Sequence, residues 1–94
     1  MTLHSFKESL SAPQPPDNIS DYLKALWYDA HNDWDKAHKI IQDIDDKNAS
    51  RIHAYLHRKE GDSFNAKYWY NKAGKDMPAF STDEEWEQII IDLL

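Results

Sequence analysis

The sequence predicts an all-α fold of two antiparallel helical hairpins followed by a C-terminal helix. Apolar residues recur at spacings of three and four along most of the chain, and no segment alternates apolar and polar residues as a half-buried strand would. Between the periodic segments stand Asn32-Asp33 and Gly61-Asp62, each a residue that tolerates a left-handed backbone followed by a helix-capping aspartate. The 94 residues, 40% of them hydrophobic and none of them cysteine, suit one domain that is stabilised by packing. Four Trp, five Tyr and three Phe supply large side chains for that packing.

A short helix over about 3–10 is predicted at the N-terminus by three apolar residues spaced three and four apart: Leu3, Phe6 and Leu10. Pro13-Gln14-Pro15-Pro16 ends it, because proline lacks the amide hydrogen and restricts the residue before it. The chain therefore divides into an N-terminal segment, residues 1–16, in which a short helix precedes a Pro-rich linker, and a single helical-repeat domain, residues 17–94.

Strong helical periodicity follows, and capping residues divide it into four helices, at about 19–31, 34–44, 49–60 and 63–74. Gly74 and then Pro78 close the last of these, in the usual order for a helix C-terminus. A final helix is predicted to begin with Thr82-Asp83-Glu84-Glu85 as a capping box. It continues with an apolar stripe: Trp86, Ile89, Ile90 and Leu93.

The two hairpins repeat a short pattern. A small residue in the first helix, a turn aspartate and a small residue early in the second helix occur as Ala25, Asp33 and Ala37. They recur 29 residues later as Ala54, Asp62 and Ala66. Because alanines let two helices approach closely, each pair marks the crossing point of a hairpin.

One segment resembles the second half of a tetratricopeptide or Sel1-like repeat: Gly61-Asp62-Ser63-Phe64-Asn65-Ala66-Lys67-Tyr68-Trp69-Tyr70-Asn71-Lys72-Ala73, with Pro78 following. Residues 49–78 fit this pattern well, with Ala54 in the small-residue position of the preceding helix. Residues 20–44 fit it more loosely, because Asn32 replaces Gly and a tetratricopeptide period is about 34 residues. The strings Leu26–Ala30, Asp33–His38 and His53–Arg58 also resemble those of short bacterial helical-repeat proteins, which implies a fold and no activity.

A helical wheel of residues 49–60 separates three faces. Ile52 and Leu56 point toward the preceding helix, and three residues toward the following one: His53, Ala54 and His57. The third face looks into the groove that such repeats present. The resemblance therefore implies a protein-interaction module that binds a protein segment with Tyr22, Asp29, Arg51, Tyr55 and Arg58. In the final helix, Trp86 and Ile90 are expected to pack on the helix at 63–74, which leaves Ile89 and Leu93 on the groove side.

Charge is segregated along the chain. The net charge of −6 disfavours binding to nucleic acid and to anionic membrane surfaces. Residues 51–75 carry a net charge of +4, whereas residues 76–94 carry −6. Either the acidic last helix lies against the basic helix at 63–74, or Arg51 and Arg58 line a groove that accepts carboxylates or phosphates.

Two further expectations concern partners and location. A homodimer through the C-terminal helix would bury Ile89, Leu93 and Leu94, and alternatively the N-terminal segment folds back over the same surface. No apolar stretch has the length of a signal peptide or of a membrane helix, so the expected location is the cytoplasm.

The histidines are the one hint of chemistry. His53 and His57 share a helix face and could chelate a metal, with His38 or Glu60 as a third ligand. The alternative is that both imidazoles are buried and hydrogen-bonded beside Tyr70. No arrangement of nucleophile, base and orienting group is recognisable, so neither enzymatic activity nor a cofactor is expected.

Overall fold

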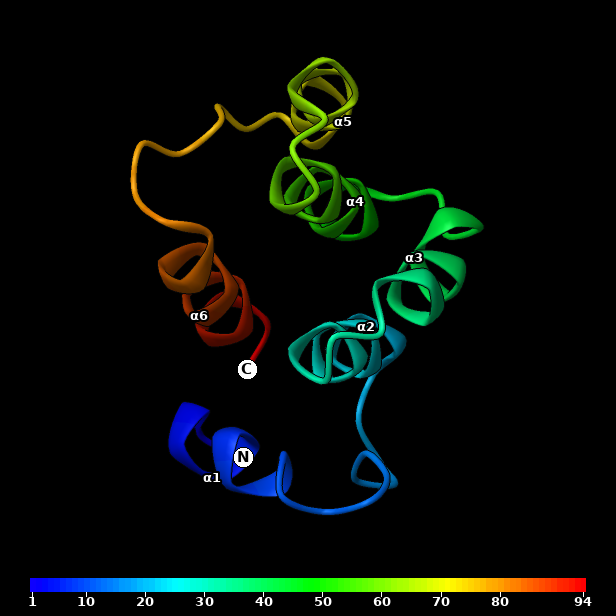
Figure 1. Ribbon diagram of the computed structural model, residues 1–94, viewed down its shortest axis with the longest axis vertical. Coiled ribbons are helices and arrows are strands. Elements are labelled where there is room, and N and C mark those ends of the chain that lie inside the picture. Colours follow the sequence, from blue (N-terminus) through cyan, green and yellow to red (C-terminus); the bar gives the residue numbers. More distant parts are fainter.

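The computed structural model describes all residues 1–94 and contains six α-helices and no strand (Figure 1). The helices are α1 Leu3–Ser9, α2 Asp21–Ala30, α3 Trp34–Gln42, α4 Lys47–Lys59, α5 Ser63–Ala73 and α6 Thr82–Leu93. The predicted all-α fold is therefore confirmed. None of these helices is both long and apolar enough to cross a bilayer.

The predicted turns are present, and each contains a residue with a left-handed backbone conformation. Asn32, Gly61 and Gly74 have φ values of +62°, +89° and +70°. Asp33 and Asp62 then cap α3 and α5, each accepting a hydrogen bond from the backbone N–H three residues on. Helix α4 begins at Lys47, two residues before the predicted start, because Asp46 caps it.

The predicted capping box of α6 is wrong by one residue. Ser81 is the N-cap, and its hydroxyl accepts a hydrogen bond from the Glu84 backbone N–H at 3.1 Å. Thr82 is instead the first helical residue. Glu85 does not reach back to a cap because its carboxylate is buried and bound to other groups.

Helices α2 and α3 pack as one hairpin and α4 and α5 as the next, with α3 also lying against α4 (Figure 1). The four alanines predicted to mark the hairpin crossings are all fully buried: Ala25, Ala37, Ala54 and Ala66. The α3–α4 contact is thus the junction between the two hairpins.

Helix α6 does not pack along α5, contrary to prediction. It lies across α2 and α4, on the side opposite α3, after residues 74–81 carry the chain away from α5 (Figure 1). The Trp86 indole N–H donates to the Leu26 carbonyl at 3.0 Å. Ile89 and Ile90 are both buried in the main core. The chain's own last helix therefore lies on the groove side of the two hairpins.

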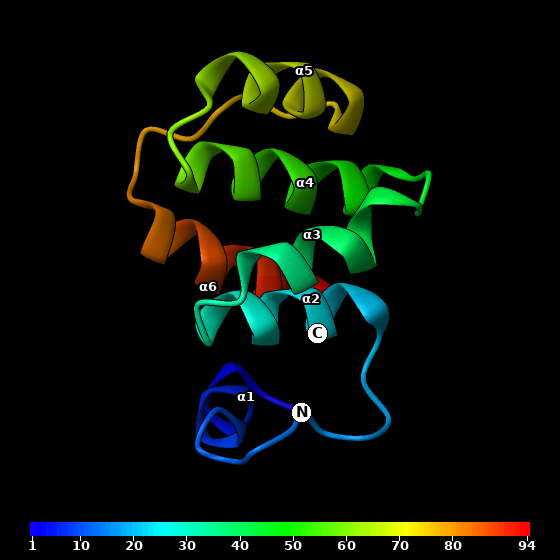
Figure 2. The same ribbon diagram turned by 45° about the vertical axis from the view of Figure 1, so that its right-hand side comes forward.

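Helix α1 folds back against α6 at the far end of this core. Phe6 is fully buried, and its ring centroid lies 5.9 Å from that of Trp86. Leu3 and Leu10 pack beside it. Figure 2 shows α1 and α5 at opposite ends of the molecule. The core accordingly extends into residues 1–16 and is not confined to residues 17–94.

Candidate metal centre

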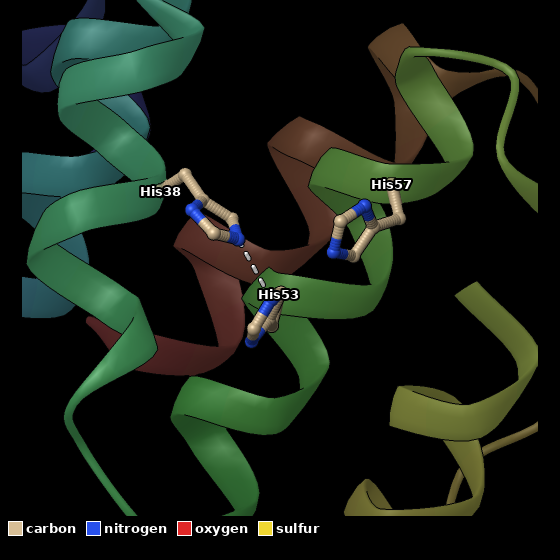
Figure 3. Close-up of side chains that lie close together, drawn as sticks. All are labelled: His38, His53 and His57. Carbon is tan, nitrogen blue, oxygen red and sulfur yellow. Dashed lines mark hydrogen bonds between the residues drawn. The ribbon is translucent and has the colours of Figure 1, made fainter. Parts of the chain in front are cut away.

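Three histidines converge at the junction of the hairpins. His38 comes from α3, and His53 and His57 come from successive turns of α4 (Figure 3). Spacing of four residues places His53 and His57 on one face of α4. This face meets α5 as expected, since His53 stacks on Trp69, but it also meets α3, since His53 contacts His38. Helices α3 and α4 therefore bring His38 close to His53 and His57, which lie at least 15 residues further along the chain.

The ring nitrogens are close enough to share one ion. The Nε2 atoms of His38 and His53 are 2.9 Å apart, and one ring nitrogen from each of the three histidines lies within 4.8 Å of the others. Zinc–nitrogen bonds are about 2.0–2.1 Å long, so donors around a tetrahedral ion lie about 3.3 Å apart. The separations in the cluster, 2.9 Å between His38 and His53 and up to 4.8 Å overall, bracket that value.

Burial favours the neutral form of two members of the cluster, the buried His53 and the partly buried His38. Burial, with the nearby His38 and His57, lowers the pKa of His53 from 6.5 to about 4. Burial also lowers the pKa of His38, and the nearby His57 adds to this. Neutral imidazole is the form that binds metals, because its unprotonated nitrogen carries the lone pair.

Two tryptophans hold the rings from either side. The indole of Trp34 stacks on His38 with ring centroids 4.8 Å apart, and that of Trp69 stacks on His53 at 3.9 Å. Trp34 is itself fixed, since its indole N–H donates to the Leu56 carbonyl at 2.8 Å. The orientation of both imidazoles is thus set before any ligand arrives.

Of the two candidates for a third ligand, His38 joins His53 and His57. Glu60 belongs to a second group, with His57 and Asp62, at the turn between α4 and α5. His53 stacks on Trp69, whereas the Tyr70 hydroxyl donates to Glu85 at 2.6 Å. The hydrogen bonding expected of His53 is present, with His38 as its partner.

The predicted groove residues make contacts within the chain. The Tyr55 hydroxyl donates to Asp29 at 2.6 Å, and both residues are buried. Arg51 pairs with Asp92 at 2.7 Å, and Arg58 pairs with Glu85 at 2.8 Å. The remaining member, Tyr22, lies apart from these and bonds to Asp46.

These contacts favour the intramolecular explanation of the charge pattern. The carboxylates of α6 neutralise arginines inside the molecule, as the intramolecular explanation requires. Those arginines lie on α4, however, and not on the helix at 63–74. The electrostatic match is therefore between α6 and the groove face of α4.

Glu85 is the structural residue that sequence reasoning missed. The sequence pattern presents it as one of the acids at a helix start, yet it is 1% exposed and accepts hydrogen bonds from Tyr70 and Arg58. Its position four residues before Ile89 was the available signal, because that spacing places both on the inward face of α6.

No family model, curated protein or solved structure matches this chain.

Proposed function

We propose that this protein binds one divalent transition-metal ion through His38, His53 and His57. The observation that supports this most directly is the convergence of three imidazoles, two of them depressed in pKa, within 4.8 Å at one helix junction. Ordinary packing of α3 on α4 requires no such gathering of three imidazole rings, because apolar side chains would fill the same space without the cost of burying polar nitrogens.

The donor set indicates the class of ion. Three neutral nitrogens and no thiolate suit Zn²⁺, Cu²⁺ or Ni²⁺, whereas Mg²⁺ and Ca²⁺ prefer oxygen ligands. A three-histidine set leaves one position of a tetrahedral ion for water or an exogenous ligand.

The place of the site indicates what the ion does for the protein. His38 belongs to the first hairpin, and His53 and His57 belong to the second. An ion bound to all three would tie the hairpins together at the contact between α3 and α4. At a free ion concentration 100 times the dissociation constant, such binding stabilises the folded state by about 2.7 kcal/mol.

The test is calorimetric titration of the chelator-treated protein with Zn²⁺, with thermal unfolding followed in parallel. We expect one ion per chain and a rise in the unfolding temperature. His38→Ala and His57→Ala, both at partly exposed positions, should weaken binding at least tenfold while the circular dichroism of the helices persists. His4 and His31 lie outside the cluster, so His4→Ala and His31→Ala are matched controls that should bind as the wild type does. Absence of stoichiometric binding, or equal binding by all four variants, would contradict the proposal.

A further inference from the structure

Glu60 is bonded to one nitrogen of His57 and leaves the other free. The Nδ1 atom of His57 and Oε2 of Glu60 are 2.7 Å apart. In the pair formed by His38 and His53, the nitrogens that meet are both Nε2. With Nδ1 of His57 engaged by a carboxylate, Nε2 is the nitrogen that remains for an ion.

We infer that Glu60 is a positioning residue, which holds His57 in the tautomer and orientation that present Nε2 to the ion. This inference rests on the proposed metal site. Metal-binding histidines commonly donate their second ring N–H to a carboxylate, which fixes the ring and makes the ligand nitrogen more basic. Glu60 would hold His57 in this way, and His57 is the one histidine of the three that has no tryptophan stacked parallel to its ring.

The turn after α4 makes this contact possible. Glu60 is the C-cap of α4, and Gly61 follows it with a φ of +89°, which ends the helix and lets Asp62 begin the next one. A side chain at residue 60 therefore still lies one helical turn beyond His57. The His57 side chain is 12% exposed and that of Glu60 is 40% exposed, so the pair connects the cluster to the surface.

The alternative role for Glu60 is that of a direct ligand, because His57, Glu60 and Asp62 could themselves surround an ion. Asp62 argues against it. Its Oδ1 accepts the Asn65 backbone N–H at 3.2 Å, and its Oδ2 accepts the Asn65 amide at 2.6 Å. Since the Asp62 carboxylate is committed to capping α5, Glu60 is left as the partner of His57 alone.

The test compares Glu60→Ala with Glu60→Gln in Zn²⁺ titrations. Glu60→Ala removes the acceptor, and we expect 10- to 100-fold weaker binding with the stoichiometry unchanged. Glu60→Gln keeps an oxygen acceptor and should recover most of the affinity. Glu8→Ala is the matched control, because it removes the carboxylate that lies 3.1 Å from His4, outside the cluster, and should bind as the wild type does.

A second readout is the tautomer of His57, measured by long-range ¹H–¹⁵N correlation in the metal-free protein. We expect the proton on Nδ1 in the wild type and a mixture of tautomers in Glu60→Ala, a change that a purely structural role would not cause. Unchanged affinity in Glu60→Ala would overturn this inference and leave the metal site standing. Two ions per chain in the wild type and one in the variant would overturn it in favour of a direct ligand. Absence of Zn²⁺ binding by the wild type would overturn the metal site itself.

Discussion

Buried carboxylates connect distant residues at the centre of this molecule. Asp29 accepts hydrogen bonds from Tyr55 and from Lys59, and Glu85 accepts from Tyr70 and from Arg58. Burial and the adjacent carboxylates raise the pKa values of Tyr55 and Tyr70 well above 10, so both remain protonated donors. Each carboxylate thus has a cation and a phenol as partners, which offsets the cost of its burial.

Replacing Glu85 by Ala should lower the free energy of unfolding by about 3 kcal/mol. The loss arises because Arg58 and the Tyr70 hydroxyl would remain largely buried without their shared acceptor. Urea unfolding followed by tryptophan fluorescence measures it. The neighbouring Glu84 is exposed, so Glu84→Ala should stay within about 0.5 kcal/mol of the wild type. Equal effects of the two substitutions would show that the buried network contributes nothing.

Helix α6 shows what pattern reasoning can establish about an element and what it cannot. Its apolar stripe correctly predicts which residues face inward, because side-chain direction follows from the helical repeat. The surface that receives them depends on the path of residues 74–81, and no local pattern encodes that path. Two arginines on α4 then bind the acids of α6, and the Arg51 guanidinium holds the pKa of Asp92 below its usual range.

This placement changes how the interaction hypothesis can be tested. Arg51→Ala with Arg58→Ala removes residues predicted to hold a partner segment, but it also removes both ion pairs to α6. Loss of partner capture in that variant would therefore have two explanations. Binding of a segment in the groove stays a prediction, and a test of it must first show that α6 remains in place.

The start of α6 provides a prediction at the scale of one element. Ser81→Ala should cost about 1 kcal/mol, because the Glu84 backbone N–H loses its acceptor at the helix N-terminus. Thr82→Ala is the matched control, since Thr82 is the first helical residue and not the cap. Denaturant unfolding of the two variants measures the difference. A larger loss for Thr82→Ala would restore the capping box that the sequence suggested.

For the molecule as a whole, local sequence patterns were enough to predict the helices, whereas contacts between helices determined which residues form the candidate metal centre. Turn residues such as Gly61 and Asp62 placed the helix boundaries to within a few residues, because capping is a local interaction. The pairing of His53 and His57 was visible as a spacing of four. The choice of His38 over Glu60 depended on how the two hairpins dock, and such long-range packing leaves no periodic mark in the sequence.

The histidine cluster should also make the whole fold sensitive to mild acid when no metal is present. The pKa of His53 is about 4 in the folded protein and about 6.5 when unfolded, so between these values the unfolded chain binds a proton that the folded protein does not. Stability is therefore full above pH 6.5 and falls as the pH drops toward 4, by on the order of 3 kcal/mol, with His38 adding to the loss.

Urea unfolding of chelator-treated protein at a series of pH values measures this dependence. The carboxyl pKa values of Asp62 and Asp92 are lowered below 3.8, so their contributions are lost only at more acidic pH and do not obscure this window. His53→Gln should flatten the profile between pH 6.5 and 4, because the group that resists protonation is gone, whereas His31→Ala should leave its slope unchanged. A wild-type profile that is flat over this range would mean that the junction between the hairpins opens enough to admit the proton. The three histidines would then not form a preorganised site for a metal ion.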